Sequence, residues 1–339
     1  MRILVGISGG VDSAFAAKKL LLEGHTVEGA VLIMHEHTEL EAAREAARSV
    51  GIKLHEIDCR FSFEEIKKNF VSEYVKGRTP NPCIICNERV KFKTLYDFAM
   101  ERGFDAIATG HYARIANVDG RYALEIAEDS RKDQTYMLYR LPQNILEALV
   151  LPLSEGKKES IRTIAAQQGI SAANRSDSQE ICFLPDGGHT EYIESVAGKC
   201  PEGSFIDDEG RVIGRHKGII HYTVGQRKGL GISLGERAFV TDINPENNTV
   251  TLSPKMSGTT SVRVSDMIYS GMEKPSVPMT AELYVKLRYT APLVRVNAEL
   301  YPDGSALLKF TDPQKSAPGQ SAVLYNNKGR VMCGGFIEK

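Results

Sequence analysis

The first third of the chain alternates short apolar runs with stretches of helical spacing. The strand-like runs are residues 2–7, 27–33, 54–57 and 106–109, and the helical stretches are 14–22, 39–50, 62–75 and 90–102. Strands separated by helices of this length pair in parallel, so the pattern predicts a doubly wound α/β sheet. Ligands of such sheets bind at the carboxyl ends of the strands, where residues 8–13 lie.

The pattern changes after about residue 195, where short apolar segments are separated by Gly, Pro and Asn. Residues 239–243 and 249–252 flank an Asn-rich turn and predict a hairpin. Alternation in 281–287 and further strands near 296–300, 306–310 and 321–325 predict an all-β module of barrel type. We therefore expect an α/β domain over residues 1–195, a small central domain over 196–260 and a C-terminal β-barrel over 261–339.

Composition narrows the class of protein. The 339 residues are 42% hydrophobic and 25% charged, which is typical of a globular protein. No run of about 18 apolar residues and no leader-like start is present, so we expect a cytoplasmic protein without a membrane partner. A net charge of −1 gives no general attraction to nucleic acid, so any RNA contact must come from local basic patches.

The loop Ser8-Gly9-Gly10-Val11-Asp12-Ser13 carries the first candidate chemistry. Its glycines remove side chains that would keep a phosphate from the backbone, and the following helix presents unpaired N–H groups. Asp12 is expected to hold Mg²⁺ that bridges the phosphates. The plain alternative is a glycine-rich turn, and the Gly-Lys-Ser/Thr ending of a Walker A loop is absent.

A Cys-x-x-Cys pair, Cys83 and Cys86, precedes a predicted helix that carries Arg89, Lys91 and Lys93. A cysteine near a helix start with cations beside it has a lowered pKa, so Cys86 is the candidate nucleophile. Cys182 lies where a polar run, residues 177–180, gives way abruptly to apolar residues. Composition alone favours a buried core thiol there. Cys59, Cys200 and Cys333 are expected to be ordinary buried or linker thiols.

The loop at residues 8–13 resembles the signature of the ATP pyrophosphatases, whose fold is adenine nucleotide alpha-hydrolase-like. Together with the other motifs it resembles the tRNA-specific 2-thiouridylase family. These motifs follow the family's order over nearly the whole chain: residues 6–13, 77–82, 86–87 with 91–93, 108–112, 132–134, 181–183, 223–231, 317–323 and 334–335.

The resemblance implies that the enzyme is a tRNA-uridine 2-sulfurtransferase acting on the wobble uridine of tRNAs for Lys, Glu and Gln. ATP would adenylate the uracil oxygen, and AMP and pyrophosphate would leave. Cys182 would carry a persulfide loaded by a cysteine desulfurase or a sulfur-relay protein. Cys86 would be the nucleophile that joins Cys182 in a transient disulfide, which a reducing cytosol permits as a catalytic species.

The resemblance also assigns binding residues. The ATP contacts would be Gly6, Ile7, Ser8, Gly9, Gly10, Val11, Asp12, Ser13, Leu32 and Gly110. The tRNA contacts would be Asn81, Pro82, Cys83, Lys132, Asp133, Gln134, Arg288 and Tyr289. From the residues themselves, the basic stretch 211–228 has five Lys or Arg and no acid, and its Arg227 and Lys228 are added as phosphate contacts.

One position departs from the family: Cys83 stands where many members have Asp three residues before the nucleophile. Cys83, Cys86 and Cys182 could instead ligate an iron–sulfur cluster, or zinc with His111 or His189 as the fourth ligand. Persulfide chemistry is favoured over both.

Two other functions stay open from the sequence. One is an ATP pyrophosphatase that delivers ammonia or an amine to an adenylated small molecule, which would need no cysteine. The other is a non-catalytic RNA-binding protein with a vestigial nucleotide site, which would bind RNA without releasing pyrophosphate.

Overall fold

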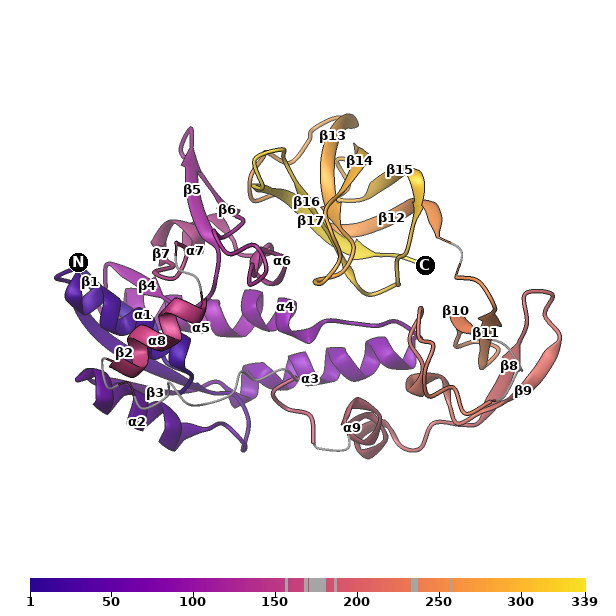
Figure 1. Ribbon diagram of the computed structural model, residues 1–339, viewed down its shortest axis with the longest axis horizontal. Helices are drawn as coiled ribbons and strands as arrows, with labels where there is room; N and C mark the ends of the chain where they lie inside the picture. Colours follow the sequence, from indigo (N-terminus) through magenta and orange to yellow (C-terminus); the bar gives the residue numbers. More distant parts are fainter. Residues whose placement is uncertain (156–157, 168–169, 171–180, 186–187, 233–236, 257) are drawn as a thin grey trace.

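The computed structural model describes residues 1–155, 158–167, 170, 181–185, 188–232, 237–256 and 258–339. In this part the chain forms an α/β domain, a small β domain and a β-barrel, in that order (Figure 1). None of the described helices combines the length and apolar content that a bilayer span requires.

The α/β domain is built on a five-stranded parallel sheet with the order β3-β2-β1-β4-β7. The strands are β1 (Arg2–Gly6), β2 (Thr26–Ile33), β3 (Leu54–Asp58), β4 (Ala106–Ala108) and β7 (Leu149–Val150). Helices α1 (Val11–Leu22), α2 (Leu40–Val50) and α8 (Lys158–Gln167) share one apolar cluster with the sheet. Helices α5 (Phe92–Glu101), α6 (Thr135–Leu138) and α7 (Gln143–Ala148) share another. The predicted doubly wound sheet is confirmed, and the strand order reverses at β1, directly before the loop at residues 8–13.

A long helical arm carries the chain away from this sheet and back (Figure 1). Helix α3 (Arg60–Val75) runs outward, and the chain returns through α4 (Pro82–Cys86), the π-helical turn η1 (Asn87–Lys91) and α5. The predicted helix 90–102 therefore starts earlier, at Pro82, because the Asn81 side chain caps it by accepting a hydrogen bond from the Cys83 N–H. The two candidate cysteines lie inside this helix rather than before it.

The central domain packs on the outer end of the arm. Its sheet has the order β10-β11-β8-β9, with β8 (Gly203–Ile206), β9 (Val212–His216), β10 (Phe239–Asn244) and β11 (Thr249–Ser253). The predicted hairpin is confirmed as β10 and β11, which turn at Asn248 with φ 48°. Helix α9 (Gly188–Ala197) and the 3-10 turn η3 (Ile219–His221) join this domain to α3 in one apolar cluster.

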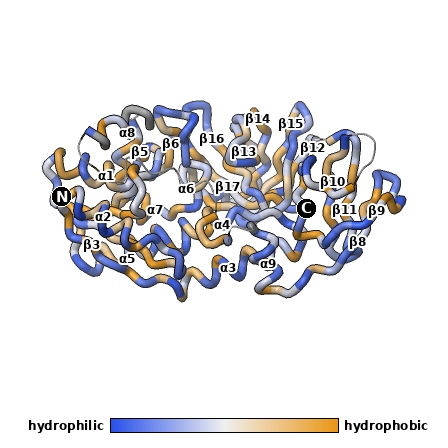
Figure 2. Tube along the Cα trace, turned by 60° about the horizontal axis from the view of Figure 1, so that its bottom comes forward, coloured by the Kyte–Doolittle hydropathy of each residue, from blue (hydrophilic) through white to orange (hydrophobic). Residues whose placement is uncertain are grey.

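The C-terminal strands close into a barrel with the order β12-β15-β14-β13-β16-β17, as predicted. The strands are β12 (Thr259–Ile268), β13 (Met279–Lys286), β14 (Val294–Leu300), β15 (Ala306–Gln314), β16 (Ser321–Tyr325) and β17 (Val331–Ile337). Inward side chains alternate with outward ones along β12 and β14, and hydrophobic and hydrophilic positions mix along the barrel strands in Figure 2. A separate hairpin, β5 (Arg114–Val118) and β6 (Arg121–Glu125), touches the barrel at Arg330.

The barrel docks on the segment of the α/β domain that contains α6. The Tyr136 hydroxyl donates to the Ser321 carbonyl at 2.9 Å, and the Tyr139 hydroxyl lies 3.1 Å from the Ser321 hydroxyl. A Cβ at Gly334 would come within 2.8 Å of the Tyr139 ring, so only glycine admits this ring against β17. Tyrosine side chains of the α/β domain therefore pack directly against the backbone of the barrel strands.

The centre of this interface is a buried guanidinium. Arg140 is only 3% exposed and donates from Nε to Glu88 of η1 at 2.7 Å. Its Nη1 donates to the Asp266 carbonyl at 3.0 Å, and its Nη2 lies 3.0 Å from the Asp266 carboxylate in β12. One side chain thus ties the turn that follows Cys86 to the barrel.

Replacing Arg140 by Leu should lower the free energy of unfolding by on the order of 3 kcal/mol, because it leaves Glu88 without its partner. The control Arg295→Leu removes the pair with Glu282, in which both side chains are about 70% exposed, and should cost less than about 1 kcal/mol. Denaturant unfolding of both variants tests the difference, and equal small losses would contradict the role given to Arg140.

Candidate active site

The loop at residues 8–13 folds as a turn that is closed by its own serines. The Ser13 hydroxyl donates to the Gly10 carbonyl at 2.9 Å and lies 3.2 Å from the Ser8 N–H, which donates to it. Gly9 has φ 85°, and a Cβ there would lie 2.8 Å from that of Ala42, so α2 packs directly on the loop. At Gly10 an added Cβ would meet only the Ser8 hydroxyl, at 3.4 Å. The first turn of α1 therefore presents its N-terminus beside open space, the geometry that suits an anion.

Gly110 holds this loop from the β4 side. A Cβ at Gly110 would lie 2.6 Å from the Asp12 carbonyl carbon and 2.7 Å from the Ser13 nitrogen. The glycine is thus needed to admit the backbone of α1, whereas the sequence suggested the approach of a nucleotide or a simple tight turn. Two residues later the Tyr112 hydroxyl donates to Asp12 Oδ1 at 2.8 Å. Sequence reasoning gave Tyr112 no role, although it stands in the motif of residues 108–112 that was singled out.

Leu32 and the two candidate zinc ligands His111 and His189 each have a defined environment. Leu32 is half-buried near the end of β2. His111 Nδ1 lies 2.9 Å from the Thr109 hydroxyl, and burial lowers the pKa of His111 to about 3, so its ring is neutral near pH 7. His189 stacks on Tyr74 and contacts the Ile220 carbonyl at 3.3 Å. In the part of the chain that the structure describes, neither histidine combines with the thiols to form a zinc site.

The expectation of a lowered pKa for Cys86 is wrong. Cys86 is the last residue of α4 and is 6% exposed, with its Sγ 3.9 Å from the Met34 sulfur. Burial raises the pKa of Cys86 to about 12, and the nearby charge of Lys91 lowers it by less than burial raises it. Because α4 begins at Pro82, Cys86 lies more than a turn from the helix start that was expected to stabilise its thiolate.

The structure nevertheless brings the three candidate thiols together. Cys83 and Cys182 both act on the pKa of Cys86, and Cys83 raises the pKa of Cys182, so each thiol lies within electrostatic reach of the others. Phe183 is buried in the same apolar cluster as Cys86 and anchors the segment that carries Cys182. Contrary to the core position that composition favoured, Cys182 itself is exposed. The polar run at 177–180 lies outside the described residues.

The thiols do not form a metal site in this arrangement. Within the described ranges, no three His, Cys, Asp or Glu side chains are gathered closely enough to hold a metal ion. The geometry therefore does not fit an iron–sulfur cluster on Cys83, Cys86 and Cys182. All six cysteines are free, and of those given no role Cys59 and Cys333 are buried and Cys200 is half-buried.

The cluster at residues 132–134 is mostly internal. Asp133 is 3% exposed, accepts a hydrogen bond from the Thr135 hydroxyl at 2.6 Å and lies 3.7 Å from Lys286 of the barrel. Gln134 accepts a hydrogen bond from the Tyr112 N–H at 2.8 Å. Burial accordingly raises the pKa of Asp133. Of this set only Lys132 presents its side chain to solvent.

Arg288 and Tyr289 lie where the barrel meets both other domains. The Arg288 Nη2 donates to the Val224 carbonyl at 3.1 Å, and the Tyr289 ring lies 6.1 Å from that of Tyr136. Asn81, two residues before Cys83, contacts Met137 beside Tyr136 at 3.3 Å. Predicted tRNA contacts from distant parts of the sequence thus converge near the start of the cysteine helix.

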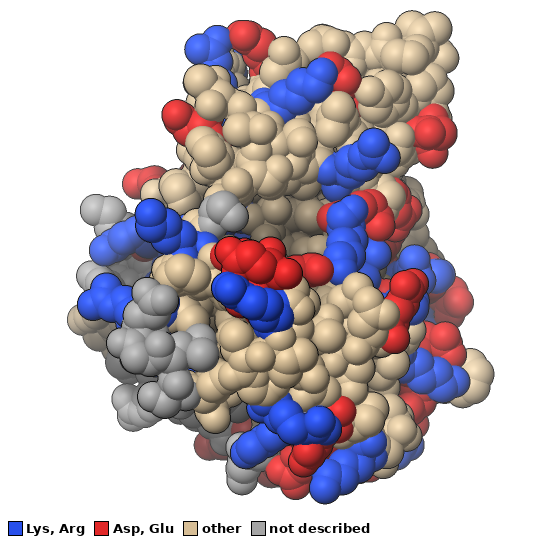
Figure 3. All heavy atoms as spheres, turned by 90° about the vertical axis from the view of Figure 1, so that its right-hand side faces the viewer, with Lys and Arg blue, Asp and Glu red and all other residues tan. Residues whose placement is uncertain are grey.

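The basic stretch 211–228 divides into two parts. Arg211 donates to Asp207 at 2.6 Å and to Glu209 at 2.8 Å, and Arg215 lies 3.9 Å from Glu202, so the hairpin's own acids balance them. Arg227 and Lys228 are exposed on a loop that Gln226 holds in shape, and no ion pair joins them to an acid in the described residues. Figure 3 shows Lys and Arg scattered among Asp and Glu on this face, some at the rim of a hollow below the barrel.

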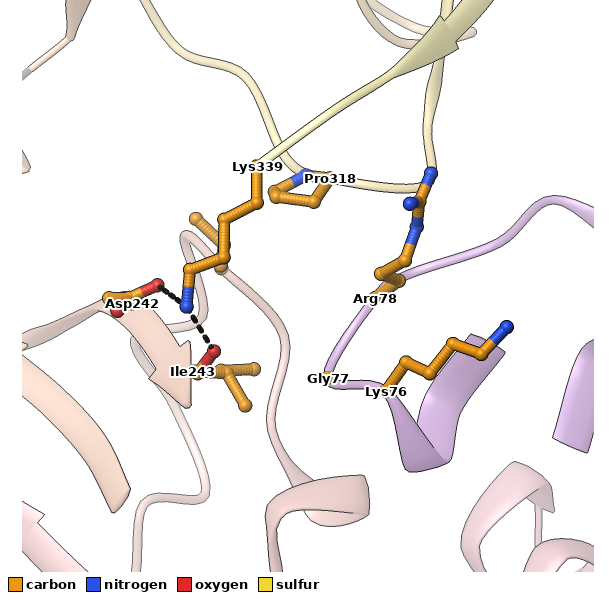
Figure 4. A pocket seen from close by; sticks show the side chains of 8 residues that line it. Lys76, Gly77, Arg78, Asp242, Ile243, Pro318 and Lys339 are labelled. Carbon is orange, nitrogen blue, oxygen red and sulfur yellow. Dashed lines mark hydrogen bonds and ion pairs between the residues drawn. The ribbon is translucent and has the colours of Figure 1, made fainter. Parts of the chain in front are cut away.

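A pocket of about 230 Å³ marks the junction of all three domains (Figure 4). Lys339 donates to the Ile243 carbonyl and to Asp242, both at 3.0 Å, and Arg78 lies 3.2 Å from Glu338. Its lining residues are Lys76, Gly77, Arg78, Val224, Asp242, Ile243, Pro318 and Lys339. Lys76, Arg78 and Lys339 already form ion pairs with acidic residues. The pocket therefore connects the domains and is not a second anion-binding site.

The whole chain is similar to proteins of known families. Three family models match: a tRNA methyl transferase HUP domain over residues 1–186, a tRNA methyl transferase PRC-barrel domain over 190–254 and an aminomethyltransferase beta-barrel domain over 259–337. The tRNA-specific 2-thiouridylase MnmA of Clostridium perfringens is 41% identical over 99% of this chain and 98% of its own. That of Treponema denticola is 41% identical over 100% and 98%. A 4-thiouridine synthetase solved with RNA and ATP has 20% identity and a TM-score of 0.38, over 54% of this chain and 44% of its own.

Replacing Gly110 by Ala should destabilise the α/β domain by about 1–3 kcal/mol, because the new methyl group has no room beside the Asp12 backbone. Thermal unfolding of the variant measures the loss. Gly6→Ala is the matched control, since its Cβ would meet Leu95 and Thr109 at ordinary distances of 3.5 and 3.6 Å. An equally stable Gly110→Ala protein would contradict the close approach.

Proposed function

The chain belongs to the tRNA-specific 2-thiouridylase family, and from this premise we propose that it catalyses ATP-dependent 2-thiolation of the wobble uridine in tRNA. The observation that carries the proposal is that the exposed Cys182 stands next to Phe183, which is buried in the same apolar cluster as Cys86. An exposed thiol can receive sulfur from a donor protein, and a neighbouring thiol can release that sulfur to the base. The substrates are the tRNAs for Lys, Glu and Gln, and the donor is a cysteine desulfurase or a sulfur-relay protein.

The nucleotide half of the reaction belongs to the loop at residues 8–13 and to the other ATP contacts assigned from the sequence. The N–H groups at the start of α1 receive the phosphates, and Gly10 leaves the space for them. The carboxylate of Asp12, oriented by Tyr112, and the serine hydroxyls are hard oxygen donors of the kind Mg²⁺ prefers, and this ion would neutralise the pyrophosphate as it leaves. ATP is cleaved to AMP and pyrophosphate, with AMP first joined to the uracil oxygen.

The sulfur half uses the two thiols in sequence. The terminal sulfur of the Cys182 persulfide attacks carbon 2 of the adenylated uracil, and AMP leaves with its oxygen. The Cys86 thiolate then attacks the Cys182 sulfur, and the second sulfur remains on the uracil as 2-thiouridine. Lys91, whose charge lowers the pKa of Cys86, is the chain's own cation for stabilising that thiolate.

The tRNA lies across the meeting point of the domains in this proposal. Arg227, Lys228 and Lys132 are exposed cations for backbone phosphates, and Arg288 with Tyr289 borders the cysteine helix. Asn81, Pro82 and Cys83 form the start of that helix, which the target base must reach. Asp133 and Gln134 act from inside, by fixing the shape of the loop that bears Lys132.

Substituting Cys86 or Cys182 by Ala should abolish thiolation, because each variant lacks one sulfur of the transfer. The assay combines enzyme, ATP, Mg²⁺, a sulfur donor and unmodified tRNA, and measures AMP release and the 2-thiouridine content of digested tRNA. Cys200→Ser is the control and should retain activity, since the proposed reaction gives Cys200 no role and its side chain lies against Gly218. Thiolation that survives in either alanine variant would refute the mechanism, and AMP formation coupled to amide synthesis would favour a ligase.

Replacing both Arg227 and Lys228 by Gln should weaken tRNA binding and flatten its salt dependence, because fewer counterions are released. The slope of log Kd against log salt should fall by about 1 to 2. Arg211→Gln is the matched control, because its charge is already balanced by Asp207 and Glu209. Filter binding over a salt series tests this, and an unchanged slope in the double variant would remove these residues from the interface.

A further inference from the structure

A continuous network of hydrogen bonds runs from the loop at residues 8–13 toward the barrel. Its first member is Tyr112, which is 2% exposed and donates from its hydroxyl to Asp12 Oδ1 at 2.8 Å. The backbone of Tyr112 is in turn held by Gln134. The Tyr112 N–H donates to the side-chain oxygen of Gln134, and the Gln134 N–H donates to the Tyr112 carbonyl, both at 2.8 Å. The position of the residue that contacts Asp12 therefore depends on Gln134.

The neighbouring Asp133 fastens the same segment to the barrel. Asp133 is 3% exposed, accepts a hydrogen bond from the Thr135 hydroxyl at 2.6 Å and lies 3.7 Å from Lys286 at the end of β13. The Thr135 hydroxyl also lies 3.0 Å from the hydroxyl of Tyr325 in β16. One planar peptide unit separates Asp133 from the residue that pairs with Tyr112, so the path from the barrel to that pair is short and stiff.

The proposed tRNA contacts lie on both sides of the Asp133–Lys286 pair. Lys132 is exposed and directly precedes Asp133, whereas Arg288 and Tyr289 closely follow Lys286 in the barrel. A tRNA that contacts all three positions would hold this pair from the α/β domain and from the barrel at once. The segment that positions Tyr112 is therefore the segment that tRNA would order.

We propose that Tyr112 is a positioning residue that couples the binding of tRNA to the binding of ATP, a role that rests on the proposed function. Its hydroxyl sets the direction of the Asp12 carboxylate, the group assigned to Mg²⁺, and its backbone is set by the segment that tRNA contacts. The ligand that binds first orders this network, so the second ligand binds without that cost. Linkage makes the effect reciprocal, so each ligand tightens the other by the same factor.

Such coupling suits a reaction in which ATP should be cleaved only beside its acceptor base. Adenylation without a uracil oxygen would transfer AMP to water, and a nucleotide site that is completed when tRNA is seated limits this loss. Gly110 gives the same segment a second contact with the loop, because a Cβ there would lie 2.6 Å from the Asp12 carbonyl carbon. The segment of residues 110–112 thus reaches Asp12 through its backbone and through a side chain.

The test measures tRNA binding with and without nucleotide. The nucleotide is α,β-methylene ATP with Mg²⁺, which cannot be cleaved between its α and β phosphates, and the RNA is an unmodified transcript of the tRNA for Lys. In the unmodified enzyme, a saturating amount of the analogue should lower the Kd for tRNA by about 5-fold or more. Tyr112→Phe keeps the buried ring and loses the hydroxyl, so it should still bind each ligand while this factor falls to about 1.

Two other buried tyrosines provide matched variants. Tyr139→Phe removes a hydroxyl that lies 3.1 Å from that of Ser321, outside the path from Asp12 to Tyr325, and should keep the full factor. Tyr325→Phe removes the barrel end of the path and should give a factor between those of the unmodified enzyme and Tyr112→Phe. Calorimetric titration of the analogue with and without tRNA should return the same factor for each protein.

Three results would overturn the inference. They are a full factor in Tyr112→Phe, independent binding of the two ligands to the unmodified enzyme, and an equal loss of the factor in Tyr139→Phe, which would assign the effect to any loosened barrel contact. A full factor in Tyr325→Phe would overturn the part given to the barrel. Failure of the proposed function is distinct, because it appears as the absence of 2-thiouridine from the product of the unmodified enzyme, whatever the coupling factor.

Discussion

The buried guanidinium of Arg140 is the interaction on which the arrangement of the site depends. It joins Glu88, in the π-helical turn directly after Cys86, to Asp266 of the barrel. A buried ion pair adds little net stability compared with apolar packing, but it penalises every arrangement in which one partner is left alone. The contact therefore favours the barrel position in which Arg140 meets both Glu88 and Asp266, and it ties that position to the helix that carries Cys83 and Cys86. The π-turn, a conformation that is found mostly at functional sites, is held by the same contact.

The sequence was a good guide wherever a pattern repeated. Parallel strands, the central hairpin and the barrel all follow from the spacing of apolar residues, which depends only on local geometry. The position of the loop at residues 8–13 followed as well, because the carboxyl end of β1 is fixed by strand order. The start of the cysteine helix was missed because Asn81 and Pro82, which cap that helix, lie before the residues whose spacing predicted it.

The properties of single side chains were harder to predict, because they depend on what other domains bring to them. The pKa of Cys86 was given the wrong direction, since the cations beside it are visible in sequence but the packing of Met34 and α3 around it is not. Composition alone favoured the core for Cys182, where its neighbour Phe183 lies instead. Asp133 was expected to contact tRNA. It is buried at the barrel interface instead, where it contacts Thr135, two residues along the chain, and Lys286 of the barrel.

In the proposed reaction, burial of Cys86 controls when the nucleophile is available. Burial raises the pKa of Cys86 to about 12, so stray oxidants and electrophiles meet a neutral thiol near pH 7. In the proposed reaction, transfer does not need a large standing population of thiolate, because both sulfurs belong to one protein and the step is intramolecular. The exposed Cys182 has the opposite requirement, since a donor protein must reach it. The proposed site thus combines an exposed thiol for loading with a buried thiol for transfer.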